Sequence, residues 1–296
     1  LEKNVNYVIG KNKLTNEKEI QIIDADNTGR IRYGSRWSNG LHEFVELKEG
    51  LPIREQTYTV ASISHPSYFE PYEEIFGLTG TLGEVTERDE ILQIYHVDSF
   101  DVPPNRKCLR KRDKTLILST AAKKEEIIID TIRKMKRKGR PILVLVYSIK
   151  ESQKLSDILR IKRIDHLLLN DLQKQDEDFV IDRAGRPGAV TIATNTAGRG
   201  TDIHISDDAL SNGGLHTLIT FWPANIRVEC QALGRSARQG QPGSCQIIFE
   251  SNEFGNDETD PTEETLRNVY EKRSNEIKMR TAFRIDLIKK EKLIFS

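Results

Sequence analysis

The sequence predicts an α/β protein, in which a parallel sheet with flanking helices is followed by one long helix. From residue 116 onward, strand-like apolar runs alternate with helical segments, which is the pattern of a parallel sheet. The run 142–146 (Ile-Leu-Val-Leu-Val) is continuously apolar, as expected of a strand buried on both faces. Asp260-Pro261 followed by Glu263 resembles a helix start, and we expect a highly charged helix to reach about residue 293.

The N-terminal hundred residues show shorter signals. Residues 7–24 predict a β-hairpin, because apolar residues surround a polar turn region. Ser38 is placed to cap a helix that ends near Gly50. Residues 57–64 and 68–76 are expected to be strand or helix pieces.

A connector separates these elements from the sheet. Pro103 and Pro104 cannot lie inside a helix, so we place a domain boundary there. Beyond it, we expect strands at 116–118, 142–146, 166–169, 189–194, 215–221 and 245–249, and helices at 123–138, 152–159 and 227–238.

Composition limits the function classes. The 296 residues suffice for about two domains, and 45 basic residues balance 45 acidic residues, which argues against a dedicated nucleic-acid binder. No apolar run approaches the ~18 residues of a membrane span, and no signal peptide is visible. Three cysteines and six histidines without metal spacing indicate a reduced compartment and no metal site. We expect a cytoplasmic protein, free or peripheral to a membrane, and the first residue, Leu1, favours a fragment of a longer chain.

The basic run 133–138 permits two interpretations. Clustered Lys and Arg are typical of nucleic-acid-binding surfaces. The run also falls at the end of an expected helix, where cations complement the helix dipole. We favour the second, structural interpretation.

The first motif with chemical content is the run 191–203 (Thr-Ile-Ala-Thr-Asn-Thr-Ala-Gly-Arg-Gly-Thr-Asp-Ile). A strand opens there into a glycine-punctuated loop that carries Arg199 and Asp202. This order places both side chains at the carboxyl edge of the sheet, where open α/β sheets bind ligands. Alone, Asp202 could simply cap a turn and Arg199 could be an ordinary surface residue. The complete run is much more specific.

The second motif is Gly-Arg-Ser-Ala-Arg-Gln-Gly at 234–240. If the helix expected at 227–238 forms, four polar residues fall at i, i+4, i+8 and i+11, within an arc of roughly 80°. This could be the solvated face of an amphipathic helix that buries Val228 and Leu233. Guanidinium groups also suit phosphate, because their forked donors match its oxygens and stay charged. The four residues are Arg227, Gln231, Arg235 and Arg238.

Together the two motifs resemble the fifth and sixth helicase motifs of RecA-like motor ATPases, and in detail those of the SecA family of protein-translocation motors. The resemblance extends over roughly residues 5–250. Residues 24–30, 34–42 and 46–50 look like the segment that returns from the preprotein cross-linking domain of SecA. The triplet Thr79-Gly80-Thr81 is similar to the family segment that couples hydrolysis to domain motion.

The resemblance implies a RecA-like fold of the P-loop NTPase superfamily and four regions. These are a return segment (1–50), the end of a first ATPase domain (51–100), a second ATPase domain (101–250), and a linker with a C-terminal helix (251–296). It also implies ATP and Mg²⁺ as cofactors. By the same resemblance, Arg238, Arg235 and Gln231 would act in catalysis, Gly198, Arg199, Gly200, Thr201 and Asp202 would bind nucleotide, and Thr79, Gly80 and Thr81 would serve coupling.

The departures from the family pattern are also informative. No Gly-x-x-x-x-Gly-Lys-Ser/Thr and no Asp-Glu-Ala-Asp-like strand end occur, so the phosphate cradle and the Mg²⁺ carboxylates are missing from this sequence. Ala237 stands where SecA has Gly, Leu233 stands where SecA has Arg, and 217–224 replaces a charged stretch.

We therefore expect the second half of a polypeptide-translocating ATPase, inactive alone. Its expected partners are an upstream ATPase domain, a polypeptide substrate and a membrane channel, with no strong nucleic-acid binding. Two alternatives stay open: an RNA or DNA helicase-type remodeller, and a non-catalytic scaffold with a RecA-like fold.

Overall fold

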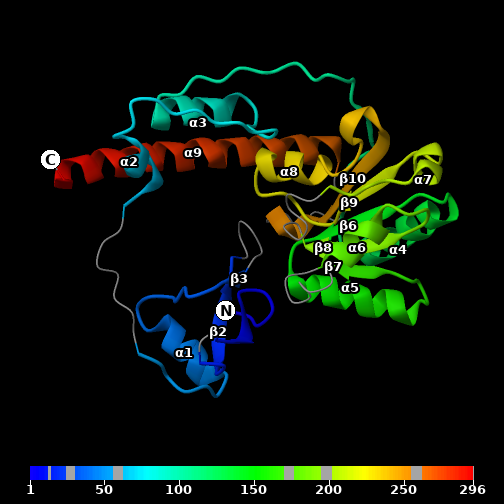
Figure 1. The fold of residues 1–296 in the computed structure, drawn as a ribbon, viewed down its shortest axis with the longest axis horizontal. Helices are drawn as coiled ribbons and strands as arrows, with labels where there is room; N and C mark the ends of the chain where they lie inside the picture. The colour runs from blue at the N-terminus through cyan, green and yellow to red at the C-terminus, as the bar shows by residue number, and fades with distance from the viewer. Residues whose placement is uncertain are drawn as a thin grey trace.

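The computed structural model describes residues 1–12, 15–24, 31–55, 63–169, 177–194, 202–254 and 262–295. A parallel sheet lies between two helical layers and is followed by a long helix, which confirms the predicted fold class (Figure 1). Its order is β4-β10-β9-β6-β8-β7, and β4 and β5 pair with successive stretches of β10. The strands are β4 (Leu109–Arg112), β5 (Leu116–Leu118), β6 (Ile142–Val146), β7 (Leu167–Leu169), β8 (Val190–Thr194), β9 (Leu215–Ile219) and β10 (Pro242–Glu250).

The central strand β6 explains why its sequence is apolar throughout. Successive side chains of a strand point to opposite faces. Ile142, Val144 and Val146 pack with α4 (Ala121–Arg137) and α5 (Ile149–Ile161). Leu143 and Leu145 belong to the core on the other face. That second face is covered by α6 (Glu177–Ala184), α7 (Asp207–Ser211) and α8 (Ile226–Leu233).

Helix α4 shows how local sequence sets the boundaries. The Thr120 side chain accepts a hydrogen bond from the Lys123 N–H and caps the start. The chain leaves the helix at Gly139, where φ is +64°. The basic run 133–138 forms the last turns, where its cations complement the helix dipole.

The N-terminal module contains the predicted hairpin. β1 (Tyr7–Lys11) pairs antiparallel with β2 (Lys18–Ile23), which also pairs with β3 (Ile31–Arg32). Helix α1 (Leu41–Lys48) places Val45 against Tyr7 and Ile20.

The caps of α1 match the expectation at one end only. The predicted Ser38 cap is wrong, because left-handed Gly40 is the N-cap residue. At the other end, left-handed Gly50 donates to the Leu47 carbonyl, and Leu51 donates to the Glu46 carbonyl. These two bonds form a Schellman motif, so the expected terminal glycine is confirmed.

This module contacts the sheet domain at the start of α5. The Lys150 N–H donates to the Asn4 carbonyl at 3.2 Å, and Lys150 Nζ lies 2.8 Å from a Glu2 carboxylate oxygen. Ile149 is buried together with Val8 and Ile23. The contact therefore combines apolar burial with a polar rim.

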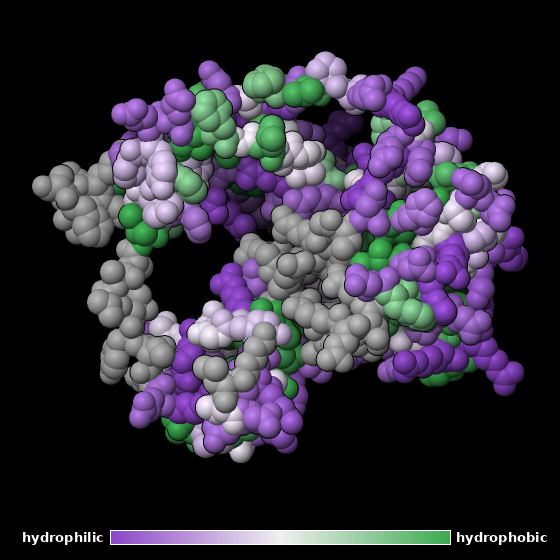
Figure 2. Space-filling view, viewed as in Figure 1, coloured by the Kyte–Doolittle hydropathy of each residue, from purple (hydrophilic) through white to green (hydrophobic). Residues whose placement is uncertain are grey.

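The long helix α9 (Glu263–Phe295) confirms the expected C-terminal helix. In Figure 1, α3 (Val85–Tyr95) lies along α9, and Arg284 of α9 bonds Glu90 of α3 at 2.7 Å. Figure 2 shows hydrophobic side chains over α3 and the segment after it, where Val85, Phe100 and Val102 are exposed. No helix in the described ranges is long and apolar enough to span a membrane.

The segment before α3 differs from the expectation. Ser64 caps α2 (His65–Phe69), which ends well before residue 76. Residues 57–62 of the expected pieces lie outside the described residues.

A buried polar network joins three strands at the amino edge of the sheet. The His216 side chain is fully buried, and its Nδ1 lies 2.8 Å from Ser244 Oγ. Arg140 donates to the same Ser244 oxygen and to the Gly214 carbonyl. Burial, with the nearby Arg140 charge, lowers the pKa of His216 to about 4.

We predict that this histidine makes folding acid-sensitive. Because the folded pKa lies below the unfolded value of 6.5, its contribution is complete above pH 6.5 and is lost as the pH falls to 4. The loss should be about 3 kcal/mol. Urea unfolding at pH 7 and pH 4.5 would measure it, with His216→Asn as the control that keeps one hydrogen-bonding atom near Ser244. Equal pH dependence in both proteins would contradict the prediction.

Candidate functional site

The structure brings together one residue from each sequence motif. Asp202, which follows β8, accepts a hydrogen bond from Arg238 Nη1 at 2.6 Å. Arg238 Nε donates to the Gly234 carbonyl at the end of α8. The Arg238 side chain is 37% exposed and the Asp202 side chain is 56% exposed, so their charged ends face solvent. Gly198, Arg199, Gly200 and Thr201 lie outside the described residues.

The expected helix over 227–238 is wrong, because α8 ends at Leu233. Arg238 begins the short 3₁₀ segment η2 (Arg238–Gly240) instead. Ala237 before it and Gln239 after it are both left-handed, with φ of +56° and +54°. A helix cannot continue through such residues, so the four polar residues do not share one helix face.

Close packing on β10 holds this turn in place. A Cβ atom at Gly243 would lie 2.7 Å from the Ala237 nitrogen, so glycine at 243 permits the approach. The Ser236 hydroxyl donates to the Leu233 carbonyl and satisfies one helix-end acceptor. Arg235 is half-buried between these residues, and its N–H donates to the Ala232 carbonyl.

Helix α8 also holds the predicted coupling segment. Gln231 Nε2 donates to Thr81 Oγ1 at 3.4 Å. Arg227 donates to the Leu82 and Glu87 carbonyls at 2.9 and 3.2 Å. Thr81 and Gln231, which are 150 positions apart in the sequence, therefore meet on this helix.

Three arginines of the connector and β4 contact the same region, although the sequence analysis missed them. Arg110 donates to the Leu233 carbonyl at 3.0 Å, and Arg106 donates to the Gln239 carbonyl at 3.3 Å. Arg112 bonds Glu229 of α8 at 2.8 Å. The two-residue spacing of Arg110 and Arg112, on one side of a strand, is the signal that could have identified this pair.

Glu229 was also not identified from the sequence. Its side chain is 1% exposed, and its two oxygens accept bonds from Arg112 and from Arg273 of α9, each at 2.8 Å. Arg273 also lies over the Trp222 ring, 4.7 Å from its centroid. Two guanidinium groups thus hold one buried carboxylate.

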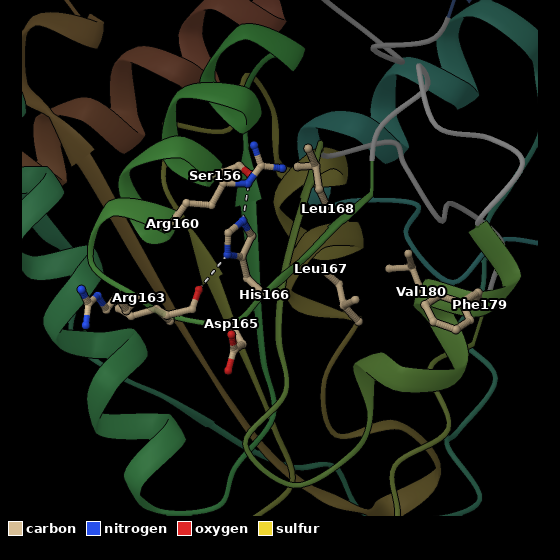
Figure 3. Close-up of a pocket in the computed structure, with 10 residues that line it drawn as sticks. Ser156, Arg160, Arg163, Asp165, His166, Leu167, Leu168, Phe179 and Val180 are labelled. Carbon is tan, nitrogen blue, oxygen red and sulfur yellow. Dashed lines mark hydrogen bonds between the residues drawn. The ribbon is translucent and has the colours of Figure 1, made fainter.

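Two cavities lie elsewhere on the domain. The first, of about 670 Å³, borders β7 between α5 and α6, and none of the predicted site residues within the described ranges lines it (Figure 3). There His166 bonds the Ser156 hydroxyl and the Ile164 carbonyl. The second, of about 790 Å³, lies between α9 and the loops after β6, β9 and β10. Burial raises the pKa of Glu151 in its wall.

The arrangement around Arg238 suits an anion. Its guanidinium is accessible, and its exposed carboxylate partner can be displaced, because a surface ion pair contributes little free energy. A phosphate oxygen would accept hydrogen bonds from the same guanidinium N–H groups. Across the described ranges, no group of three or more His, Cys, Asp or Glu residues could hold a metal ion.

Comparisons with known sequences point to one family. The family model described as the SecA DEAD-like domain matches residues 4–91, and the one described as the SecA P-loop domain matches residues 107–212. Protein translocase subunit SecA of Wolinella succinogenes is 39% identical over 277 residues, covering 92% of this chain and 31% of that protein. The subunit of Sulfurimonas denitrificans is 41% identical over 248 residues, covering 84% and 28%. The chain thus spans about three-tenths of the length of these curated relatives.

Similar solved structures are helicase-type proteins at low identity. S. cerevisiae Dbp5 bound to RNA and ADP BeF3 is 19% identical, with a TM-score of 0.42, covering 66% of this chain and 53% of that one. The E. coli DEAD-box protein SrmB bound to RraA is 19% identical, with a TM-score of 0.38, covering 51% and 85%.

We predict that the two ion pairs of this region differ strongly in their contribution to stability. Asp202→Asn should change the free energy of unfolding by less than about 1 kcal/mol, because the Arg238 pair is exposed. Glu229→Ala should cost about 3–5 kcal/mol, because it leaves Arg273 buried without its carboxylate. Urea unfolding of both variants would test this, and equal losses would contradict it.

Proposed function

The chain is a SecA-like protein, and from that premise we propose that it is the second motor half of an ATPase that couples ATP hydrolysis to polypeptide translocation. The observation that carries the proposal is the Asp202–Arg238 contact beside α8, the helix that also holds Thr81. One helix would therefore connect a phosphate-binding arginine with the coupling segment.

ATP would lie between this domain and a first ATPase domain. Asp202 and Arg199 would contact the nucleotide from the first motif, and Gly198, Gly200 and Thr201 would bind it as well. Bound ATP would supply the phosphoryl group, and Arg238 would exchange its carboxylate partner for a phosphate oxygen.

The remaining residues would support this exchange. Arg235 would aid nucleotide binding and domain closure. Gln231 would hold Thr81, so that the triplet Thr79-Gly80-Thr81 follows any movement of α8. Their contact at 3.4 Å supports this role.

The first ATPase domain would supply the phosphate loop and the Mg²⁺ carboxylates, which do not occur in this sequence. We infer that the 296-residue chain alone does not hydrolyse ATP. A protein of the full length of its relatives would act in the cytoplasm or at a membrane channel, on polypeptide, without strong nucleic-acid binding.

We predict that the full-length protein hydrolyses ATP and that an unfolded polypeptide stimulates it more than RNA or DNA does. A steady-state ATPase assay with each polymer, at several salt concentrations, would measure this, with the 296-residue chain as the inactive control. Stronger, salt-sensitive stimulation by a polynucleotide would support the helicase alternative. No hydrolysis under any condition would support the non-catalytic scaffold.

We further predict unequal roles for the two arginines of the second motif. In the full-length protein, Arg238→Ala should lower single-turnover hydrolysis by about 10³-fold or more, because an arginine finger stabilises charge on the transferred phosphoryl group. Arg235→Ala should mainly weaken nucleotide binding. Arg183→Ala is a matched control, because that arginine stacks on Phe179 away from the second motif. Unchanged turnover in both motif variants would refute the assignment.

A further inference from the structure

A buried ion pair connects α8 directly to α9. The Glu229 and Arg273 side chains are 1% and 7% exposed, and Arg273 Nη1 lies 2.8 Å from Glu229 Oε2. The same nitrogen donates to the Pro223 carbonyl at 3.2 Å, and the guanidinium contacts both the Trp222 and the Tyr270 ring. Arg273 thus has hydrogen bonds and ring contacts that fix its position.

A second bridge runs through α3. Glu90 accepts a bond from Arg284 of α9 at 2.7 Å, and its other oxygen lies 3.4 Å from Arg227 of α8. The Glu90 side chain is 9% exposed. Helix α8 is therefore joined to α9 both directly and through α3.

Arg238 lies just beyond the C-terminal end of α8. Gly234 follows Glu229 by five positions, about 7.5 Å along a helix. The Gly234 carbonyl accepts the Arg238 Nε bond at 2.9 Å, and Arg238 then reaches Asp202. A continuous series of contacts runs from α9 through α8 to Arg238.

The ion pairs in this series differ in how much free energy they contribute. A buried carboxylate that loses its guanidinium partner is strongly destabilised, whereas an exposed pair contributes little. If α9 shifts, the buried Glu229–Arg273 ion pair should remain intact, and the exposed Arg238–Asp202 ion pair should break first.

We propose that Glu229 and Arg273 are positioning residues through which α9 sets the placement of Arg238 and of Thr81. A polypeptide or partner that displaces α9 would then alter the nucleotide site without touching it. The catalytic consequence rests on the proposed function, whereas the mechanical link between α8 and α9 does not.

Hydrogen exchange tests the mechanical link without nucleotide. In the 296-residue chain, Arg273→Met should speed amide exchange in α8 and in residues 234–240 as well as in α9. Arg273→Lys, which keeps the charge, should restore much of the protection. Arg140→Met is the matched control, because it removes a half-buried arginine that bonds Gly214 and Ser244 and lies outside the α8–α9 contacts.

Faster exchange confined to α9 would overturn the proposal, and so would the same α8 response to Arg140→Met. If Arg273→Met does not fold, Arg284→Met breaks only the second bridge at an exposed side chain. That variant should speed exchange in α3 and α8 together. No change in α8 would again overturn the proposal.

An ATPase assay on the full-length protein tests the catalytic consequence. Arg273→Met should lower kcat by about 2- to 30-fold, the range for variants that act on coupling, with KM for ATP nearly unchanged. Arg140→Met should leave kcat unchanged, and an equal fall in both would contradict a positioning role. If the wild-type protein shows no ATPase activity, the proposed function fails, while the exchange result still decides the link between α8 and α9.

Discussion

Parallel pairing on both sides of β6 is the constraint on which the rest of this structure depends. β6 pairs in parallel with β8 and with β9, and helices cover both faces of the sheet. Asp202 leads into α7 and Arg238 leads into β10, and the turn that carries Arg238 packs on Gly243 at the start of that strand. The two side chains meet there, although 36 positions separate them in the chain.

Beside this contact, α8 connects the parts of the molecule. Its inner side buries Ala232 and Leu233 in the core, and Glu229 is held by two arginines. Gln231 contacts the segment that ends at Thr81. Apolar burial and a paired carboxylate fix the helix, while the arginine beyond its end stays accessible. A site that must exchange an ion pair for a ligand needs this combination of a rigid support and a weak exposed contact.

The sequence predicted the elements whose signals are local. The apolar run at β6, the glycine that ends α1 and the charge-rich α9 follow from periodicity and capping chemistry. The end of α8 did not follow, because residues 234–238 carry no helix breaker stronger than Gly234. Their conformation depends on tertiary packing against Gly243, which the periodicity of apolar residues does not indicate.

The candidate site was likewise predictable only in part. Asp202, Arg238, Gln231 and Thr81 were identified from motifs, and the structure brings them together in two pairs. Glu229 could not be recognised, because an acidic residue in a helix usually faces solvent. Its partner Arg273 is 44 residues away on α9, and only tertiary structure places the two in contact.

Leu233 and Ala237, the two positions near the end of α8 at which the sequence departs from the expected SecA pattern, have different physical consequences. Leu233 is 5% exposed within the core, so an apolar residue suits this site, where an arginine would need a partner for its charge. Ala237 is left-handed, a conformation that costs a residue with a Cβ about 1 kcal/mol and that glycine adopts freely. Leu233 therefore fits its apolar surroundings, whereas Ala237 introduces backbone strain directly beside Arg238. That strain persists because Gly243 and the end of α8 hold the turn on both sides. The turn before Arg238 is thus held by its surroundings and not by its own conformational preference.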